Sequence, residues 1–149
     1  MFTIEKAVLD EGTKKRLIEL SEEWAAEGIT FGLRANTEED LKEPCFVAVS
    51  EGEIIGYTFG HYYVKEEKTS VIDVGSRCFE VDELYVSPAF RSMGAGRALY
   101  KAIEEEAYRE ADFVTLVTAT KDWRRILKFY ADDMGMVFHD AYLVKGKTE

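Results

Sequence analysis

The chain contains little cysteine, histidine or proline. These low counts argue against disulfide bonds, metal sites and domain boundaries. Its two cysteines, Cys45 and Cys78, lie in strand-like segments and match no metal-ligand spacing, so we expect two buried thiols in a reducing cytoplasm. Neither of the two histidines has partners at ligand spacing, so we expect no bound metal. Because there are only two prolines, no repeat and no glycine-rich linker, we expect one domain over residues 1–149.

Long apolar runs and an excess of positive charge are also missing. No apolar run approaches the ~20 residues that span a bilayer, and Met1–Lys6 lacks the pattern of a signal peptide, so we expect a cytoplasmic protein without a membrane partner. The formal net charge of −10 argues against nucleic acid as a partner, because phosphate contacts need a basic surface. The same charge is compatible with a cationic substrate, or with a solubility surface alone.

Hydrophobic residues make up 46% of the chain, and their spacing predicts alternating strands and helices. The strand–loop–helix–strand segment over residues 77–118 predicts a parallel βαβ unit within a mixed sheet, hence an α/β (α+β) fold with one layered core. In the first half of the chain we expect a strand over 2–9, a helix over 11–27 ending at Gly28, a short helix capped by the hydroxyl of Thr37, and strands over 45–49 and 54–64. In the second half we expect a strand over 77–86, a helix from the Gly94 region to about 111, and a strand over 113–118 that is buried on both sides. A last helix with Trp123, Ile126, Leu127 and Tyr130 on one face and one or two closing strands over 136–145 complete the prediction.

A glycine-containing loop, Arg91-Ser92-Met93-Gly94-Ala95-Gly96, lies between a predicted strand and a predicted helix. Successive backbone N–H groups in such a loop can point at one anion, and the helix dipole adds partial positive charge. Arg91 and Arg97 can add charge beside a pyrophosphate. The loop is not a nucleotide P-loop, because it lacks the required lysine, and a dinucleotide fingerprint would need glycine where Leu99 stands.

Residues 84–99, Leu-Tyr-Val-Ser-Pro-Ala-Phe-Arg-Ser-Met-Gly-Ala-Gly-Arg-Ala-Leu, resemble the central motif of the GCN5-related N-acetyltransferases (GNAT). The family core, Arg/Gln-x-x-Gly-x-Gly/Ala, is met by Arg91, Gly94 and Gly96. Residues 128–136 resemble the later Phe-Tyr…Gly-Phe segment, with Met136 in place of the phenylalanine and Trp123 where the family often has asparagine. The predicted element order extends the resemblance over nearly the whole chain.

The resemblance implies an enzyme with acetyl-CoA as co-substrate. In such a protein a primary amine of a small molecule or peptide attacks the thioester directly, within a ternary complex. A backbone N–H near Leu84 to Val86 stabilises the charged carbonyl oxygen, and Tyr130 protonates the departing thiolate. The residues implied in coenzyme binding are Leu84, Tyr85, Val86, Arg91, Ser92, Met93, Gly94, Ala95, Gly96 and Arg97.

Such a reaction needs a base, because an amine with a pKa of ~10.4 is almost entirely protonated at neutral pH. Three carboxylates precede the loop, namely Glu80, Asp82 and Glu83. In a regular strand Glu80 and Asp82 share one face and Glu83 points away. Similar enzymes place a base at one of the first two positions, so Asp82 and Glu80 are the leading candidates and Glu83 is the third.

The acceptor is the least defined part of the prediction. In similar enzymes the first helices and the loop after them form the wall of the acceptor site, which here makes Phe31 and Arg34 candidates and Trp24 more a core residue. A homodimer is left open. Two alternatives are also left open: a non-catalytic acyl-CoA sensor or interaction module on the same fold, and an acetyltransferase that acts on protein N-termini or lysines.

Overall fold

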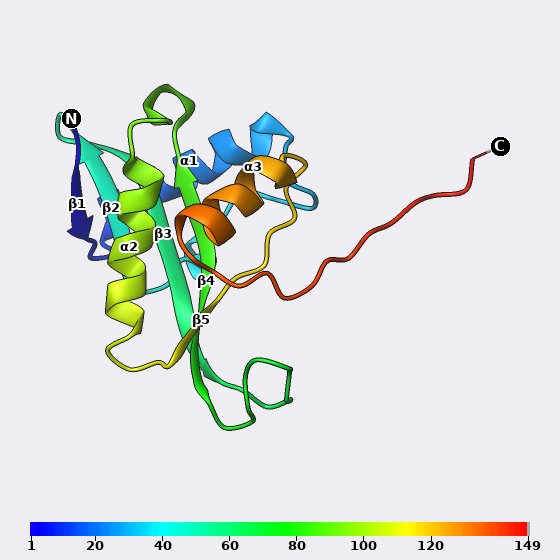
Figure 1. The fold of residues 1–149 in the computed structure, drawn as a ribbon. Coiled ribbons are helices and arrows are strands. Elements are labelled where there is room, and N and C mark those ends of the chain that lie inside the picture. The colour runs from blue at the N-terminus through cyan, green and yellow to red at the C-terminus, as the bar shows by residue number, and fades with distance from the viewer. Residues whose placement is uncertain (149) are drawn as a thin grey trace.

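The structure is a computed structural model that describes residues 1–148, and Figure 1 shows it as a ribbon. One mixed sheet contains five strands in the order β1-β2-β3-β4-β5. The first four strands are antiparallel to their neighbours, and β5 pairs in parallel with β4. The strands are β1 (Thr3–Lys6), β2 (Cys45–Ser50), β3 (Glu53–Val64), β4 (Arg77–Val86) and β5 (Phe113–Thr115).

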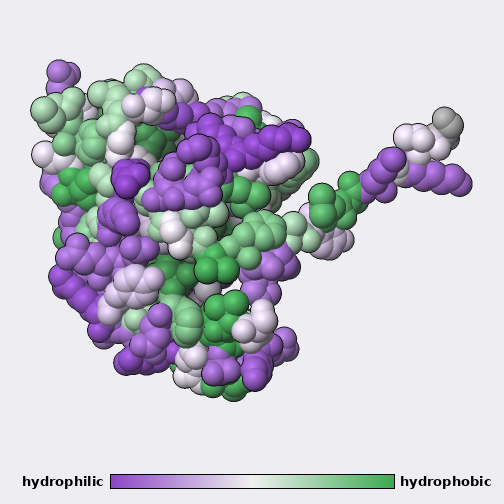
Figure 2. Space-filling view, in the orientation of Figure 1, coloured by the Kyte–Doolittle hydropathy of each residue, from purple (hydrophilic) through white to green (hydrophobic). Residues whose placement is uncertain are grey.

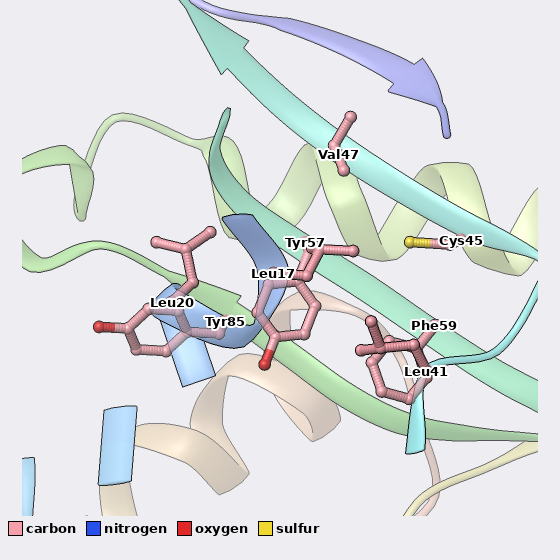
Figure 3. Packing of buried hydrophobic residues seen from close by; sticks show 8 residues of the cluster. All are labelled: Leu17, Leu20, Leu41, Cys45, Val47, Tyr57, Phe59 and Tyr85. Carbon is pink, nitrogen blue, oxygen red and sulfur yellow. The ribbon is translucent and has the colours of Figure 1, made fainter. Parts of the chain in front are cut away.

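Two helices cover the two faces of this sheet. On one face α1 (Glu11–Glu27) places Leu17 and Leu20 in a fully buried cluster, drawn in Figure 3, with side chains from β2, β3 and β4. On the other face α2 (Ala95–Ala107) packs Leu99 and Ile103 against the alternate residues of the same strands. This division follows from the period of two along a strand, and it leaves the end of β4 between the two helices.

Local signals explain where α1 begins and ends. The Asp10 carboxylate accepts a hydrogen bond of 2.8 Å from the Thr13 amide, which caps the helix. Gly28 ends the helix at φ 67°, a left-handed conformation that glycine adopts at little cost. The end at Gly28 agrees with the sequence prediction, whereas the cap at Asp10 was not predicted.

The predicted fold class is confirmed, and so are the long strands β3 and β4 and the parallel β4–α2–β5 unit. Both cysteines are free and buried within strands, as expected. No helix in residues 1–148 combines the length and the apolar character needed to cross a bilayer.

The predicted closing strands over residues 136–145 are wrong. After Gly135 this part of the chain forms no helix or strand and leaves the body of the molecule as an extended tail (Figure 1). The doubly buried strand over 113–118 is also wrong, because only Phe113–Thr115 pair with β4 and Val117 is 85% exposed. Beyond residue 115 the chain diverges from β4 and has no ladder partner there, so it is not a strand.

Other differences concern single elements. β1 is shorter than predicted, α2 ends at Ala107 rather than near residue 111, and the short second helix is a single 3₁₀ turn, η1 (Glu38–Asp40). Thr37 and Asp40 form a capping box at this turn, and the Asp40 carboxylate accepts from both the amide and the hydroxyl of Thr37. The last helix consists of α3 (Trp123–Leu127) and a π-helical turn, η3 (Lys128–Asp133). Trp123 is half exposed, so it does not share the inward face predicted for it.

Candidate active site

A cavity of about 470 Å³ lies where β4 and the chain after β5 separate. The two strands pair only between residues 78–80 and 113–115, so residues 81–86 face residues 116–120 across a gap instead of a hydrogen-bonded ladder. The glycine-containing loop and the last helix close the cavity. Its further lining includes Trp24, Ile29, Thr30, Arg91, Ser92, Gly94, Gly96, Arg97, Arg125, Ile126, Lys128, Phe129, Tyr130 and Asp133.

The backbone of β4 directs donors into this gap. The Ser87 amide donates to the Ile55 carbonyl on β3 at 2.9 Å, so residues 85 and 87 face β3. Because amides alternate along an antiparallel strand, the N–H groups of Leu84 and Val86 face the gap. Arg91 Nε donates to the Val86 carbonyl at 2.9 Å, which agrees with this orientation. The gap therefore has backbone donors in the segment that the sequence predicted.

The glycine-containing loop leads directly into α2, and the first backbone amides of this helix have no hydrogen-bond acceptor within the helix. Gly94 is the N-cap with φ 87°, and the Ala98 amide donates to the Gly94 carbonyl at 3.0 Å. The amides before Ala98 have no intrahelical partner, as at every helix start. A Cβ built on Gly96 would meet only the side chains of Leu84 and Val86, at 3.8 and 3.9 Å, so packing does not require glycine there. The missing side chain instead leaves cavity space beside the helix N-terminus, which suits an anion.

Eight of the ten residues predicted to bind coenzyme line the cavity, and two do not. Met93 points to solvent, with 48% of its surface exposed, whereas Ala95 is buried against β2 and β3 on the α2 face. The eight lining residues are Leu84, Tyr85, Val86, Arg91, Ser92, Gly94, Gly96 and Arg97.

Arg91 has a partner that the sequence did not indicate. Its guanidinium binds both carboxylate oxygens of Glu27, each at 2.7 Å, and thereby ties the end of α1 to the loop. The hydrogen bonds from Arg91 lower the pKa of Glu27 below its ordinary value, against a smaller effect of burial. Arg97, in contrast, has no ion-pair partner within residues 1–148 and is exposed at the cavity. Of the two predicted cations, Arg97 is thus the one available to a ligand.

Tyr130 lies in the π-helical turn η3 and lines the cavity. Its ring contacts Tyr100 and Phe129 edge-on, with centroid distances of 5.9 and 4.9 Å. Burial raises the pKa of Tyr130 to about 12, so its hydroxyl stays protonated at neutral pH. Short π-helical turns are frequent at functional sites because they redirect a side chain.

A bulge in β4 changes the arrangement of the three carboxylates. Glu83 lies opposite Phe59 and Val81 lies opposite Gly60, which leaves Asp82 as an extra residue without a partner. Gly60 permits this close approach, because a Cβ there would lie 2.1 Å from the Glu80 carbonyl oxygen. The prediction that Glu83 points away from Glu80 is therefore wrong, since the extra residue returns Glu83 to the α1 face.

Glu83 is held on that face by two hydrogen bonds. Its Oε1 accepts from the Tyr57 hydroxyl at 2.7 Å and from Asn36 Nδ2 at 2.8 Å. Burial raises the pKa of Glu83 above its ordinary value, and these two hydrogen bonds offset that effect only in part. Glu83 is also one of the residues that line the cavity, next to Asp82 in the chain.

Asp82 lines the cavity and contacts two basic side chains. Its Oδ2 lies 2.9 Å from His61 Nδ1 and 3.0 Å from Lys42 Nζ. Glu80 is close by, outside the cavity lining, and its pKa is raised first by burial and then by the charge of Asp82. One ligand atom from each of His61, Glu80 and Asp82 lies within 4.8 Å of the others, a possible metal-ligand group that sequence spacing missed because it joins two strands.

The two predicted acceptor residues lie outside the cavity lining. Phe31 is exposed and carries the Lys121 ammonium over its ring, at 5.3 Å from the centroid. Arg34 forms an ion pair with Asp40 at 2.9 Å. Trp24, expected in the core, packs on that core and also lines the cavity, stacked on Tyr85 at a centroid distance of 5.3 Å. The opposite wall, residues 116–120, carries no motif from which a role could have been predicted.

The chain matches a family model described as the acetyltransferase (GNAT) family over residues 9–136. The chain belongs to this family. The resemblance drawn from residues 84–99 is thus confirmed. A comparison with curated proteins gives no match.

Solved structures of GNAT acetyltransferases have the same fold. A protein from Pyrococcus furiosus, described as an acetyl transferase, has a TM-score of 0.71 and 19% identity, over 99% of this chain and 100% of that one. An aminoglycoside N-acetyltransferase in complex with CoA has a TM-score of 0.68 and 14% identity, over 99% and 95%. An aminoglycoside acetyltransferase from an uncultured soil metagenomic sample, in complex with sisomicin, has a TM-score of 0.64 and 18% identity, over 97% of each chain.

Proposed function

We propose that residues 1–149 form one N-acetyltransferase domain that transfers an acetyl group from acetyl-CoA to a primary amine of a small molecule or peptide. One observation carries the proposal. A single cavity between the end of β4 and the chain after β5 is lined by the loop around Gly96 and by the residues Asp82 and Tyr130. Family membership supports acetyl transfer as the reaction.

The lining of the cavity fits coenzyme A in shape and charge. The amides of residues 92–97 would hold the pyrophosphate at the N-terminus of α2, where Gly96 leaves room for it. Arg97 lines the cavity without an acidic partner in residues 1–148, whereas the other lining cations Arg125 and Lys128 are paired with Asp122 and Asp133. The bound coenzyme supplies the acetyl group as a thioester, with a thiolate as the leaving group. The Leu84 and Val86 amides are the donors that would stabilise negative charge on the acyl oxygen.

Asp82 is the base that removes the proton of the acceptor ammonium, directly or through a water molecule. It lines the cavity, and because both of its basic partners contact Oδ2, Oδ1 is free to accept a proton. His61 and Lys42, at 2.9 and 3.0 Å from Oδ2, hold the carboxylate in this orientation, and Oδ1 passes the proton on to solvent after acetyl transfer. Glu80 lies next to His61 and Asp82, outside the cavity lining, and adds negative charge there. Glu83, which lines the cavity, adds negative charge as well.

Tyr130 is the acid that protonates the leaving thiolate. The Tyr130 phenol, whose pKa is about 12, is protonated at neutral pH. It hydrogen-bonds to the sulfur, transfers its proton as the C–S bond breaks, and the phenolate regains a proton from solvent. The neighbouring rings of Tyr100 and Phe129 fix the direction of this side chain. Tyr85 also lines the cavity, but its side chain is held on the α1 face, stacked on Trp24 and next to Glu27.

The acceptor class that fits best is a cationic small-molecule amine. Asp82 and Glu83 give the cavity negative charge at one end, and the Trp24 ring offers an aromatic face. Two of the structural relatives act on aminoglycosides according to their names, which supports small cationic amines over proteins. Phe31 and Arg34 lie farther out and would contact only the distal part of a long acceptor.

The deciding experiment measures CoA release from acetyl-CoA with a panel of polyamines, aminoglycosides, simple amines and peptides. Turnover of one class by the wild type, lost in Asp82→Asn and in Tyr130→Phe, is the expected result. Tight binding of acetyl-CoA without turnover of any acceptor would favour the non-catalytic sensor instead. Turnover of peptides alone would favour a protein acetyltransferase.

A further inference from the structure

Lys42 places a primary amine beside the proposed base. Its Nζ lies 3.0 Å from Oδ2 of Asp82, and Asp82 belongs to the cavity lining. Among the ion pairs within residues 1–148, this is the one that joins a lysine to Asp82. The protein thus carries, on its own chain and next to the base, the chemical group that the proposed reaction acetylates.

The backbone around Lys42 keeps this amine close to the cavity. Leu41 and Cys45, which lie on either side of it in the chain, are both buried in the hydrophobic cluster of Figure 3. The Lys42 side chain itself is 44% exposed and has a flexible four-carbon stem, so its amine can move while the backbone stays in place. An amine that is tethered in this way has a high effective concentration at the site.

The amine needs only a short movement to reach the expected position of the thioester. The Leu84 amide, which faces the gap and would bind the acyl oxygen, is two residues from Asp82, about 7 Å along a strand. A nucleophile attacks from a distance of ~3–3.5 Å. Rotation about the side-chain bonds of Lys42 can cover the difference between these distances without any change in the backbone.

We propose that Lys42 is a self-acetylation site, which the cavity of the same molecule modifies when acetyl-CoA is bound and no acceptor is present. The proposal rests on the function proposed above, because it uses the same coenzyme, base and acid. A cationic acceptor competes with Lys42 for the Asp82 carboxylate, so a saturating acceptor should slow the modification.

The chemistry is the proposed acetyl transfer with Lys42 as the acceptor. Asp82 takes one proton from the ammonium, the nitrogen lone pair forms a bond to the thioester carbon, and the C–S bond breaks with its electron pair on sulfur. The nitrogen loses a second proton to water as the amide forms, and Tyr130 protonates the thiolate. The products are Nε-acetyllysine, CoA and one net proton.

Acetylation of Lys42 would change the surroundings of the base. The amide is neutral and forms no ion pair, so Asp82 would keep only His61, at 2.9 Å, as a basic partner. Because an exposed ion pair contributes little to stability, the modified protein should stay folded. The modification therefore alters the charge at the site and not the fold.

Two other lysines serve as internal comparisons. Lys68 pairs with Asp73 at 3.8 Å, outside the cavity lining, and its side chain is 74% exposed. Lys128 lines the cavity but pairs with Asp133, at 3.3 Å. Hydrophilic residues cover the exposed sides of α2 and of the last helix (Figure 2), so exposure alone does not single out one amine. Chemical acetylation in solution would follow exposure and favour Lys68, whereas modification by the cavity favours Lys42.

The test is incubation with deuterated acetyl-CoA and no acceptor, followed by mass spectrometry of the label on each lysine. The label excludes acetyl groups acquired during expression. We expect Lys42 to react at least about tenfold faster than Lys68 and Lys128, with a rate constant that is independent of protein concentration. Asp82→Asn should slow the labelling of Lys42 at least about tenfold. Lys42→Arg should remove most of the label, and the matched control Lys68→Arg should not.

The outcomes separate this site from the function on which it rests. Turnover of an external amine with no label on Lys42 would overturn self-acetylation and leave the proposed function intact. Equal labelling of Lys42 and Lys68, an unchanged rate in a folded Asp82→Asn protein, or a rate constant that rises with protein concentration would overturn it as well. Label on Lys42 that depends on Asp82, without turnover of any external amine, would support self-acetylation and contradict the proposed acceptor. If neither reaction occurs, both proposals fail. Circular dichroism checks that each variant is folded.

Discussion

At position 96 the absent side chain creates room for a ligand, because the fold itself would accept a larger residue. A Cβ on Gly96 would meet its nearest neighbours at ordinary contact distances of 3.8 and 3.9 Å. We therefore expect Gly96→Ala to fold with unchanged stability, within about 0.5 kcal/mol, and Gly96→Trp to fill the cavity and abolish CoA binding. Urea unfolding measures the stability of both variants, and calorimetric titration measures their affinity for CoA. Unchanged affinity in a folded Gly96→Trp protein would place the coenzyme elsewhere.

Tyr130 can be tested by removing one oxygen atom. Tyr130→Phe keeps the ring and its contacts with Tyr100 and Phe129, so the KM for acetyl-CoA should change little. Loss of the acid should lower kcat at least about tenfold, since general acid catalysis contributes ~10²–10⁴-fold. Pre-steady-state measurement of acetyl transfer separates this loss from slow product release. A wild-type rate for that step would make Tyr130 a packing residue.

Glu83 should lower stability at neutral pH. Its pKa is raised in the folded protein by burial, so the folded state holds this proton more tightly than the unfolded chain does. The favourable contribution is complete below the ordinary glutamate pKa and is lost as the pH rises through the folded value. Glu83→Gln can still accept from Tyr57 and Asn36 but carries no charge. We expect it to be more stable at pH 7, by about 1 kcal/mol.

Urea unfolding of this variant at several pH values measures the effect. The gain of Glu83→Gln over the wild type should shrink as the pH falls towards 3, where both side chains are neutral. Glu83→Ala is the matched control, because it removes the acceptor as well as the charge and leaves the Tyr57 hydroxyl and the Asn36 amide without their partner. It should lose stability, and a Glu83→Gln protein that loses as much would show that the charge is not the destabilising feature.

Between elements, the Arg91–Glu27 pair joins α1 to the loop that begins α2. The two side chains are only 30% and 20% exposed and form two hydrogen bonds of 2.7 Å. In a double-mutant cycle with Arg91→Met and Glu27→Gln, we expect a coupling energy of about 1–3 kcal/mol. Because Arg91 lowers the pKa of Glu27, this stabilisation is present above the ordinary glutamate pKa and is lost only as the pH falls through the lower folded value.

Unfolding at pH 7 and at pH 3 gives both halves of this prediction. Arg97→Met is the control for the arginine substitution, since Arg97 is exposed and has no acidic partner within residues 1–148. It should leave stability unchanged and weaken CoA binding. A coupling energy near zero at pH 7 would show that the Arg91–Glu27 ion pair adds nothing to the stability of the folded protein beyond what hydration of the two separate charges provides.

Sequence alone predicted the features that depend on neighbouring residues. Gly28 ends the helix that directly precedes it, and the glycine-containing loop is continuous in the chain, so both were predicted. The Arg91–Glu27 pair joins residues 64 positions apart, and no local pattern indicates it. The bulge at Asp82 depends on Gly60 of the neighbouring strand β3. Because Gly60 has no side chain, the Phe79 ring of β4 can lie against its backbone. The strict alternation assumed for Glu80, Asp82 and Glu83 therefore failed at the site itself.

At the scale of the whole molecule, the negative charge of this protein should influence how fast a cationic acceptor arrives, and the carboxylates at the cavity should contribute most. Attraction acts over ~30 Å at 0.01 M salt but over only ~8 Å at 0.15 M. For a polyamine acceptor we expect kcat/KM to fall about tenfold between these concentrations, because steering raises association rates by ~10–10³-fold. A neutral amine of similar size should show little change, and equal salt dependence for the two would exclude steering.

A pair of variants identifies which charges are responsible. Glu66 and Glu67 lie between β3 and β4, outside the cavity lining, and changing both to lysine shifts the net charge from −10 to −6. If the whole field steers the acceptor, this double variant should lower kcat/KM at 0.01 M salt and flatten its salt dependence. If the cavity carboxylates dominate, Glu83→Gln should flatten it instead while Glu66→Lys/Glu67→Lys behaves as the wild type. We expect the second outcome, because Asp82 and Glu83 lie at the cavity and field lines concentrate in a cleft with low-dielectric walls.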